Sequence, residues 1–344
     1  MDFVQNMKVK AASMQKKLVL PEGTEPRTVK AARILVDENL AASVTLIGRQ
    51  SEIDAIAAGE GVDLTGIEIV NPELSPNRDR YAQSYYEMVH AREEAKKAKG
   101  GAVLEPVTPE KAGMEITGAL RWGAMMVHLG DADASVAGAE NTTGDVLRAG
   151  LAIIGMVPGL KTASSCFVMT GLDPAWGYNG SLIFSDCAVV PDPTAEQLAD
   201  IAQSAALSCR EFLGCDPVAA LLSFSTKGSA KHDNVAKVQK AVEILKSRNP
   251  GFLFDGELQA DAALVPSVTD KKAPGSPVRG NVNTLVFPDL GSGNIGYKLV
   301  QRLGNAGAFG PFLQGFAKPI SDLSRGASVE DIVATAAVTL ARAK

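Results

Sequence analysis

Cysteine and histidine are scarce in this sequence of 344 residues, which contains four cysteines and three histidines. None of the cysteines belongs to a Cys-x-x-Cys pair. Zinc sites are built mainly from paired cysteine and histidine ligands, so the sequence predicts no metal centre of this kind. We expect Cys166, Cys187, Cys209 and Cys215 to be buried, reduced thiols.

Long apolar runs and an excess of charge of one sign are also missing. No segment approaches the roughly 20 apolar residues that span a bilayer, and the N-terminal stretch has no continuous apolar core of a signal peptide. The 34 basic and 39 acidic residues give a formal net charge of −5. This charge argues against general nucleic-acid binding but allows a local basic pocket for an anion. We therefore expect a cytoplasmic protein that binds neither membrane nor nucleic acid.

The length and the order of apolar runs favour two globular α/β domains. A chain of 344 residues exceeds what one hydrophobic core usually organises. Residues 18–20 and 44–47 are predicted strands, and residues 27–39 have helical spacing between them. This strand–helix–strand order predicts a parallel sheet with helices on its faces.

The same patterns continue along the chain. Residues 82–99 are predicted to form a charged helix, and residues 101–118 a loop or an insertion. Further strands are predicted at 134–137, 162–169, 182–190, 219–223 and 284–288. Further helices are predicted from 144 onward and at 195–213, 233–247 and 328–343.

Residues 290–296 (LGSGNIG) contain the pattern Gly-x-Gly-x-x-Gly. They follow an apolar strand and open a helix, which is the context of a dinucleotide loop. Their late position, and the lack of an acidic residue about 20 positions further on, argue against that use. Two interpretations remain: a tight glycine turn, or exposed backbone N–H groups near Gly293 and Asn294 that bind an anion at a helix N-terminus.

Residues 223–231 (SFSTKGSAK) follow a predicted strand. Small hydroxyl residues, a glycine and lysines at the end of a strand suit phosphate binding, which makes Ser225 and Lys227 candidates. The segment is not a Walker A loop, because the first glycine is missing. A solvated loop is the alternative.

Residues 141–148 (NTTGDVLR) form a polar turn that leads into a helix, with Arg148 one turn inside it. Arginine offers a planar fork of donors that matches phosphate or carboxylate, and a surface ion pair is the alternative. Asp131 and Asp133 lie just upstream. Two carboxylates without further ligands predict a structural turn rather than a metal site.

Residues 324–331 (SRGASVED) allow two interpretations. Ser328 and Asp331 have the spacing of a capping box, which predicts a carboxylate at a helix start. A functional interpretation makes Asp331 a base, with Ser324 and Arg325 as donors toward a developing oxyanion. Spacing alone leaves both interpretations open.

Taken in their order, these segments resemble the phosphate acetyltransferase (phosphotransacetylase) family and its acetyl/butyryl relatives. The resemblance covers most of the chain. The matching stretches are LPEGTEPRTVKAA, GDAD, TTGDVLR, LSFSTKGSAK, DGELQADAALVPSV, KKAPGSP, GSGNIGYKLVQRLG, GPFLQG and DLSRGASVED.

The resemblance implies an α/β fold of two domains, with mostly parallel sheets flanked by helices and an active site in the cleft between the domains. Residues 1–155 and 311–344 are expected to form one domain and residues 156–310 the other. The family relationship also implies a homodimer. It implies reversible acetyl transfer between acetyl phosphate and coenzyme A, with acetyl-CoA and inorganic phosphate as products and coenzyme A as substrate rather than bound cofactor.

The resemblance also implies roles for residues. Asp331 would accept the proton of the coenzyme A thiol, whose thiolate attacks the acetyl carbonyl directly in a ternary complex, without an acyl-enzyme. Arg325 and Ser324 would stabilise the oxyanion and the leaving phosphate. The expected substrate-binding residues are Thr142, Thr143, Arg148, Ser225, Lys227, Gly293 and Asn294.

The chain departs from the family pattern in residues 88–118 and at one further position. MVHAR follows the YYE at residues 85–87, where the family has RKHKG, so Val89 replaces an arginine associated with coenzyme A. Asn141 stands where histidine often precedes the threonine pair. The acyl preference therefore stays open. The alternatives are a phosphate butyryl- or propionyltransferase, a dehydrogenase-like enzyme on the same general architecture, and a non-catalytic protein that binds acyl phosphates.

Overall fold

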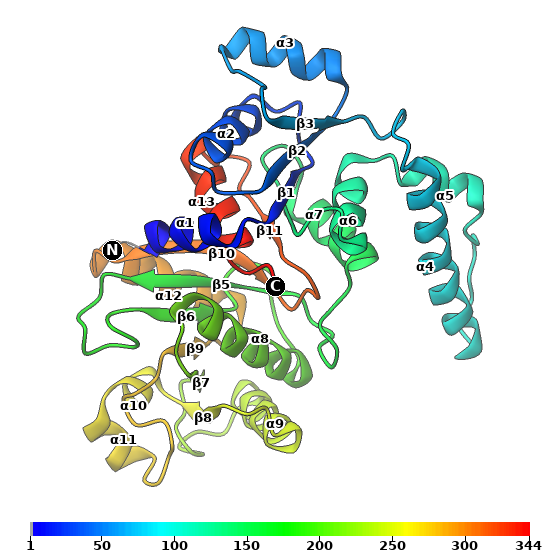
Figure 1. The fold of residues 1–344 in the computed structure, drawn as a ribbon. Helices are drawn as coiled ribbons and strands as arrows, with labels where there is room; N and C mark the ends of the chain where they lie inside the picture. Colours follow the sequence, from blue (N-terminus) through cyan, green and yellow to red (C-terminus); the bar gives the residue numbers. More distant parts are fainter. Residues whose placement is uncertain (1–2) are drawn as a thin grey trace. The chain divides into compact units, whose positions relative to one another are not determined.

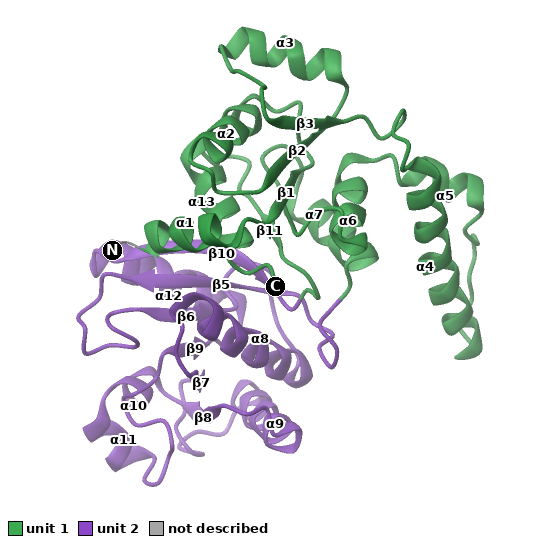
Figure 2. Ribbon diagram, in the orientation of Figure 1, with its two compact units in different colours: residues 1–155, 316–344 green, residues 156–315 purple. Residues whose placement is uncertain are grey.

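The chain forms two compact units. The computed structural model describes residues 3–344 (Figure 1). Unit 1 combines the chain up to Gly155 with Phe316–Lys344, and unit 2 is Met156–Gly315 (Figure 2). Within the described range, no helix is both long and apolar enough to cross a membrane.

Unit 1 is built on one parallel sheet with the strand order β11-β4-β1-β2-β3. Its strands are β1 (Lys17–Leu20), β2 (Ser43–Ile47), β3 (Ile67–Val70), β4 (Ala134–Ala137) and β11 (Ile320–Asp322). Its helices are α1 (Phe3–Met14), α2 (Pro26–Asp37), α3 (Gln50–Glu60), α4 (Arg78–Ala98), α5 (Pro109–Glu115), α6 (Ala119–Leu129), α7 (Thr143–Ile153) and α13 (Val329–Leu340). The parallel sheet predicted from the sequence is confirmed.

Helices cover both faces of the unit 1 sheet. α2 and α13 lie on one face, and α6 and α7 lie on the other (Figure 1). α2 begins after Glu25, whose side chain accepts a hydrogen bond from the Thr28 N–H. Its buried residues Val29, Ala32 and Leu35 form an apolar stripe that joins α13 and the strands in one core.

Unit 2 contains a mixed sheet with the strand order β10-β5-β6-β9-β7-β8. Its strands are β5 (Ser164–Thr170), β6 (Leu182–Ser185), β7 (Val218–Leu222), β8 (Leu253–Leu258), β9 (Thr284–Val286) and β10 (Gly307–Gln314). Its helices are α8 (Ala195–Leu213), α9 (Asp233–Arg248), α10 (Ala260–Leu264), α11 (Pro266–Lys272) and α12 (Leu290–Leu303). The four strands from β6 to β8 in this order run parallel, whereas β5 pairs antiparallel with both β6 and β10.

Some segments differ from the expectation. The predicted loop over residues 101–118 is wrong for 109–115, which form α5 with Thr108 as its N-cap. The strand predicted at 182–190 ends at Ser185, because the residues that follow bond the Asp186 side chain instead of a neighbouring strand. Residue 310, the predicted second domain boundary, lies inside β10, and this strand pairs with β5 of unit 2.

A pair of glycine substitutions tests the packing of unit 1. A side-chain carbon at Gly138 would lie 2.5 Å from Asp322 Oδ1 and 2.6 Å from Leu323 N, at a φ of +116°. We expect Gly138→Ala to lower the free energy of unfolding by about 3 kcal/mol through overlap and backbone strain. Urea unfolding measures this change.

The matched control is Gly59→Ala in α3. A carbon added there has no neighbour within 4 Å, and alanine in a helix is more stable than glycine by about 0.5–1 kcal/mol. We therefore expect Gly59→Ala to raise the urea midpoint. An equal response of the two variants would contradict the close approach at Gly138.

Candidate active site

Two predicted segments meet at one edge of the unit 1 sheet. β4 and β11 are parallel neighbours, with Ala137 in register with Asp322. The residues that follow them therefore leave the sheet at the same edge, where α/β proteins usually bind ligands. The Thr143 hydroxyl donates to Asp322 Oδ2 at 2.6 Å. The NTTGDVLR and DLSRG segments are thus brought together.

The loop after β4 is organised by a buried glutamate, Glu22, which is 4% exposed. Its carboxylate accepts hydrogen bonds at 2.8–3.1 Å from the backbone N–H groups of residues 138–141 and from Asn141 Nδ2. Bonds to a charged acceptor are stronger than neutral ones. This residue was not among the predicted site residues. Its position directly after β1, in the LPEGTEPR stretch, is the only signal for it in the sequence.

Arg27 of α2 joins this loop to the loop after β11. Its guanidinium donates to the carbonyl oxygens of Ala139 at 2.9 Å, Arg325 at 2.9 Å and Ala327 at 2.7 Å. The Glu25 carboxylate accepts from its Nε at 2.7 Å. One side chain therefore fixes the backbone on both sides of the predicted reaction centre. The sequence analysis also missed this residue.

Ser324 and Arg325 are exposed at the turn that Arg27 holds. The Ser324 hydroxyl accepts from the Gly326 N–H at 3.2 Å. Among the described residues, the Arg325 guanidinium has no hydrogen-bond or ion-pair partner in the protein. A fixed backbone with unused donors suits the binding of an anion.

Asp331 lies in the first turn of α13 and forms the predicted capping box. Its Oδ2 accepts from the Ser328 N–H at 2.9 Å, and its own N–H donates to the Ser328 hydroxyl at 3.1 Å. The capping interpretation is therefore present in the structure. The same bonds fix the direction of the exposed carboxylate and leave its second oxygen without a partner in residues 3–344.

Arg148 borders a groove of about 260 Å³ between the start of α6 and the exposed side of α7. Arg121, Asn141 and Asp145 also line this groove. Arg148 pairs with Asp145 at 2.6 Å, and its side chain is 71% exposed. Exposed ion pairs contribute little stability, so an anionic ligand could replace Asp145 as the partner of Arg148.

Thr142 stabilises the start of α7 beside this groove. Its hydroxyl accepts from the Asp145 N–H at 3.2 Å and lies 2.7 Å from Asp145 Oδ2, to which it donates. The bond that the Thr142 hydroxyl donates, followed by the bond from Arg148, lowers the pKa of Asp145. The negative charge next to Arg148 is therefore retained to a lower pH than on an ordinary aspartate.

Asp322 is a second buried acid at this edge of the sheet. It is 6% exposed, and its Oδ1 has no hydrogen-bond partner in the described structure. Burial raises its pKa to about 6, and the charge of Glu22 adds to the increase, whereas the Thr143 bond lowers it. Asp322 therefore holds a proton at a pH where most aspartates are ionised.

The SFSTKGSAK loop of unit 2 is tied to β8. The Ser225 hydroxyl donates to Glu257 Oε1 at 2.9 Å. Lys227 Nζ pairs with Asp255 and donates to the Gly256 carbonyl at 2.8 Å. Both candidates are therefore engaged in protein contacts rather than left as a solvated loop.

The GSGNIG segment forms the first turns of α12 and not a turn before it. The Gly293 N–H donates to the Asp289 carbonyl at 3.2 Å, and a side chain at Gly293 would overlap the Asp186 carbonyl. Asn294 Nδ2 donates to the Cys187 carbonyl at 3.1 Å. The tight glycine turn is therefore wrong: Gly293 allows close packing of α12.

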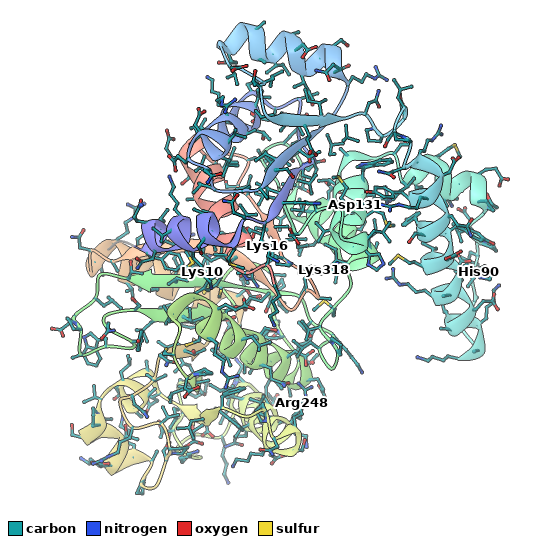
Figure 3. The ribbon with its side chains drawn as sticks, viewed as in Figure 1. Lys10, Lys16, His90, Asp131, Arg248 and Lys318 are labelled. Carbon is teal, nitrogen blue, oxygen red and sulfur yellow. The ribbon has the colours of Figure 1, made fainter. Side chains whose placement is uncertain are left out.

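The carboxylates of the GDAD stretch have structural partners. Asp131, labelled in Figure 3, accepts from Arg80 and Tyr81 of α4. Asp133 accepts from the Lys17 N–H at 2.8 Å. Lys318, also labelled, donates to the Val127 carbonyl at 2.7 Å and fastens the segment before β11 to α6. Among residues 3–344, no group of three or more acidic, histidine or cysteine side chains is placed to hold a metal.

The cysteines play no visible part at this edge of the sheet. Cys166, Cys187 and Cys209 are buried as predicted, whereas Cys215 is partly exposed. Burial raises the pKa of the Cys209 thiol to about 12 and raises that of Cys187 further. Neither thiol is therefore a ready nucleophile at neutral pH.

A larger hollow of about 360 Å³ lies in unit 2 between the 157–160 loop and helices α8 and α9. It contains none of the predicted site residues. Arg248, labelled in Figure 3, lines it but pairs with the buried Asp200 at 2.8 Å. Size alone therefore does not make it the better candidate.

Comparison with known proteins gives matches along the whole chain. A family model described as phosphate acetyl/butaryl transferase matches residues 2–340. The phosphate acetyltransferase of Treponema pallidum (strain Nichols) is 57% identical over 343 residues, which covers 99% of this chain and 98% of that protein. The phosphate acetyltransferase of Thermoanaerobacterium thermosaccharolyticum is 47% identical over 344 residues and all of both chains. The solved structure of EutD phosphotransacetylase from Staphylococcus aureus has a TM-score of 0.86 at 39% identity, covering 100% of this chain and 98% of that one.

The buried acid predicts a pH dependence of stability. The folded chain binds the Asp322 proton more tightly than the unfolded chain, whose ordinary value is 3.8. This contribution is complete below about pH 4 and is lost as the pH rises through about 6. Relative to Asp322→Asn, we expect the unfolding free energy of the natural protein to fall by about 2.4 kcal/mol from pH 4 to pH 7.

Urea unfolding of both proteins at several pH values measures this difference. The contributions of other titrating groups to the unfolding free energy cancel in this difference, because both proteins contain those groups. A difference that does not change with pH would show that Asp322 titrates normally in the folded protein.

Proposed function

The chain belongs to the phosphate acetyl/butaryl transferase family, as its motifs predict, and we propose that it transfers an acetyl group reversibly between acetyl phosphate and coenzyme A. The observation that carries this proposal is the single loop cluster that Glu22 and Arg27 hold at the ends of β4 and β11. It places the Ser324-Arg325 turn beside the loop that leads to Arg148. The substrates and products are coenzyme A, acetyl-CoA, acetyl phosphate and inorganic phosphate.

Asp331 is the proposed base. Its unpaired oxygen accepts the proton of the coenzyme A thiol, and the thiolate attacks the acetyl carbon. A tetrahedral intermediate forms and then breaks its bond to the phosphate oxygen, which releases acetyl-CoA and inorganic phosphate; the phosphate takes up the proton, and the Asp331 carboxylate is restored. No acyl-enzyme and no bound cofactor takes part in this sequence.

Proton transfer from the coenzyme A thiol to the Asp331 carboxylate is unfavourable unless the thiolate is stabilised. Ordinary carboxylates and thiols titrate near about 4 and 8.5, so a free carboxylate is the much weaker base. A cation that stabilises the thiolate narrows this gap, and the unpaired Arg325 guanidinium in the neighbouring turn is the proposed source. Positioning of the reactants supplies much of the remaining acceleration.

Arg325 and Ser324 are proposed to donate to the oxyanion of the intermediate and to the phosphate that leaves. Arg148, with Thr142 and Thr143 at the start of its helix, is proposed to hold the phosphoryl group in the groove between α6 and α7. The exposed pairing of Arg148 with Asp145 supports this role, because Arg148 can exchange the Asp145 carboxylate for the phosphoryl group of the ligand.

Unit 2 is proposed to contribute to coenzyme A binding. Ser225, Lys227, Gly293 and Asn294 all have protein partners, so their proposed role is to fix the loops after β7 and β9 whose surfaces contact the substrate. The location of the site between the two domains stays a prediction, and so do the homodimer and the cytoplasmic location.

Substitution of the proposed reaction centre tests the function. With acetyl phosphate and coenzyme A, we expect Arg325→Ala to lower kcat by about 100- to 1,000-fold through loss of an oxyanion donor. We expect Asp331→Asn to lower it by about 100- to 10,000-fold through loss of the base. Absorbance of the thioester measures both rates.

Ser328→Ala is the matched control for Asp331. It removes the hydroxyl of the capping box, which costs about 1 kcal/mol of stability, but leaves the carboxylate in place. We expect its activity to stay within about threefold of the natural protein. Equal loss of activity in Ser328→Ala and Asp331→Asn would show that Asp331 acts only as a capping residue and not as the base.

Ligand-dependent melting separates this function from the dehydrogenase alternative. Coenzyme A at about 100 times its dissociation constant should stabilise the protein by about 2.7 kcal/mol and raise the melting temperature. NAD and NADP should leave it unchanged. A shift with either dinucleotide and none with coenzyme A would favour the dehydrogenase-like alternative.

A further inference from the structure

A small apolar hollow adjoins the Arg148 groove within unit 1. It shares two of its lining residues, Leu120 of α6 and Ala149 of α7, with that groove. Its floor is formed by β4 and β11, including Ala137 and Ile320. The groove and the hollow therefore meet at Leu120 and Ala149.

Close packing of the helices on the sheet sets the size of the hollow. A side-chain carbon at Gly150 of α7 would overlap Ile320 and would lie 2.9 Å from Phe316 Cε1. A carbon at Gly123 of α6 would lie 2.6 Å from Pro21 Cγ. Because both helices lie this close to the strands, a volume of only about 10 Å³ remains.

That volume matches one small group. A cavity needs about 10–15 Å³ to hold one water molecule, so this hollow has room for a single small group and not for an acyl chain. Only two side chains in its lining carry polar groups, Ser135 and Ser321, and the Ser321 hydroxyl already accepts from Thr339 at 2.7 Å. The rest of the lining is apolar, which suits a methyl group.

We propose that this hollow receives the methyl group of acetyl phosphate while the phosphoryl group lies at Arg148. This inference rests on the proposed acyl transfer and extends it to the acyl preference, which the motifs leave open. β11 runs from the floor of the hollow directly to Ser324 and Arg325, so the floor and the proposed oxyanion donors belong to one continuous segment.

The size of the hollow makes the enzyme selective for the two-carbon acyl group. Butyryl phosphate has two additional methylene groups, for which the packed walls leave no room. One extra methylene in a fixed pocket typically changes kcat/KM by about 10- to 200-fold. We therefore expect the natural protein to prefer acetyl over butyryl phosphate by at least about 100-fold in kcat/KM.

Two conservative substitutions enlarge the hollow from opposite walls. Val146→Ala shortens a buried side chain of α7, and Ile320→Val removes one methyl group from β11. We expect each to raise the butyryl-to-acetyl ratio of kcat/KM by about tenfold or more. Ile320→Val is the milder change and keeps the test available if Val146→Ala folds poorly.

Leu151→Ala is the matched control. It also shortens an apolar side chain of α7, but Leu151 is 42% exposed and does not line the hollow. We expect its butyryl-to-acetyl ratio of kcat/KM to equal that of the natural protein. All four proteins are compared by circular dichroism and then assayed with acetyl, propionyl and butyryl phosphate.

Each outcome has one meaning. A raised ratio in Val146→Ala or Ile320→Val, with no change in Leu151→Ala, supports the hollow as the acyl site. Natural activity on acetyl phosphate with an unchanged ratio in both folded variants overturns this assignment and leaves the transferase function standing. No activity on any of the three acyl phosphates removes the function and this inference together.

Discussion

The candidate site depends on one buried carboxylate. Glu22 accepts five hydrogen bonds from the loop after β4, four of them from consecutive backbone N–H groups, and so fixes its course into α7. Arg27, in the first turn of α2, donates to carbonyl groups of that loop and of the loop after β11. The segment of residues 22–27 thus presents acceptors to one loop and donors to two. These bonds fix the backbone of the loop that leads into α7 and of the Ser324-Arg325 turn.

This arrangement has an energetic cost at its centre. Asp322 is buried near Glu22, one of its oxygens has no partner in the described structure, and its pKa is raised to about 6. A buried polar atom without a partner destabilises a fold, and perturbed acids gather at functional sites. Gly138 allows the close approach to Asp322, because any larger residue would overlap it. The packing here serves the site at the expense of stability.

Asp331 shows how a structural bond and a chemical role coexist in one side chain. Capping uses one carboxylate oxygen and the Ser328 N–H, which removes most of the freedom of the side chain. The other oxygen stays exposed and has a fixed direction. A base that is held before its substrate arrives loses little entropy during reaction. The two interpretations that spacing left open are therefore compatible.

The sequence by itself determined many of the elements and the family. Apolar periodicity predicted α8 over its full length and β4 to the residue, and the ordered motifs named Ser324, Arg325 and Asp331 as candidates. Periodicity reports local burial, so it could not reveal the antiparallel edge formed by β5 and β10, or α5 in a polar segment. Only the tertiary structure showed Glu22 and Arg27 at the centre of the loops, because their partners lie more than 100 residues away in the chain. It also decided the size of the hollow, since that depends on how closely glycines let two helices approach a sheet.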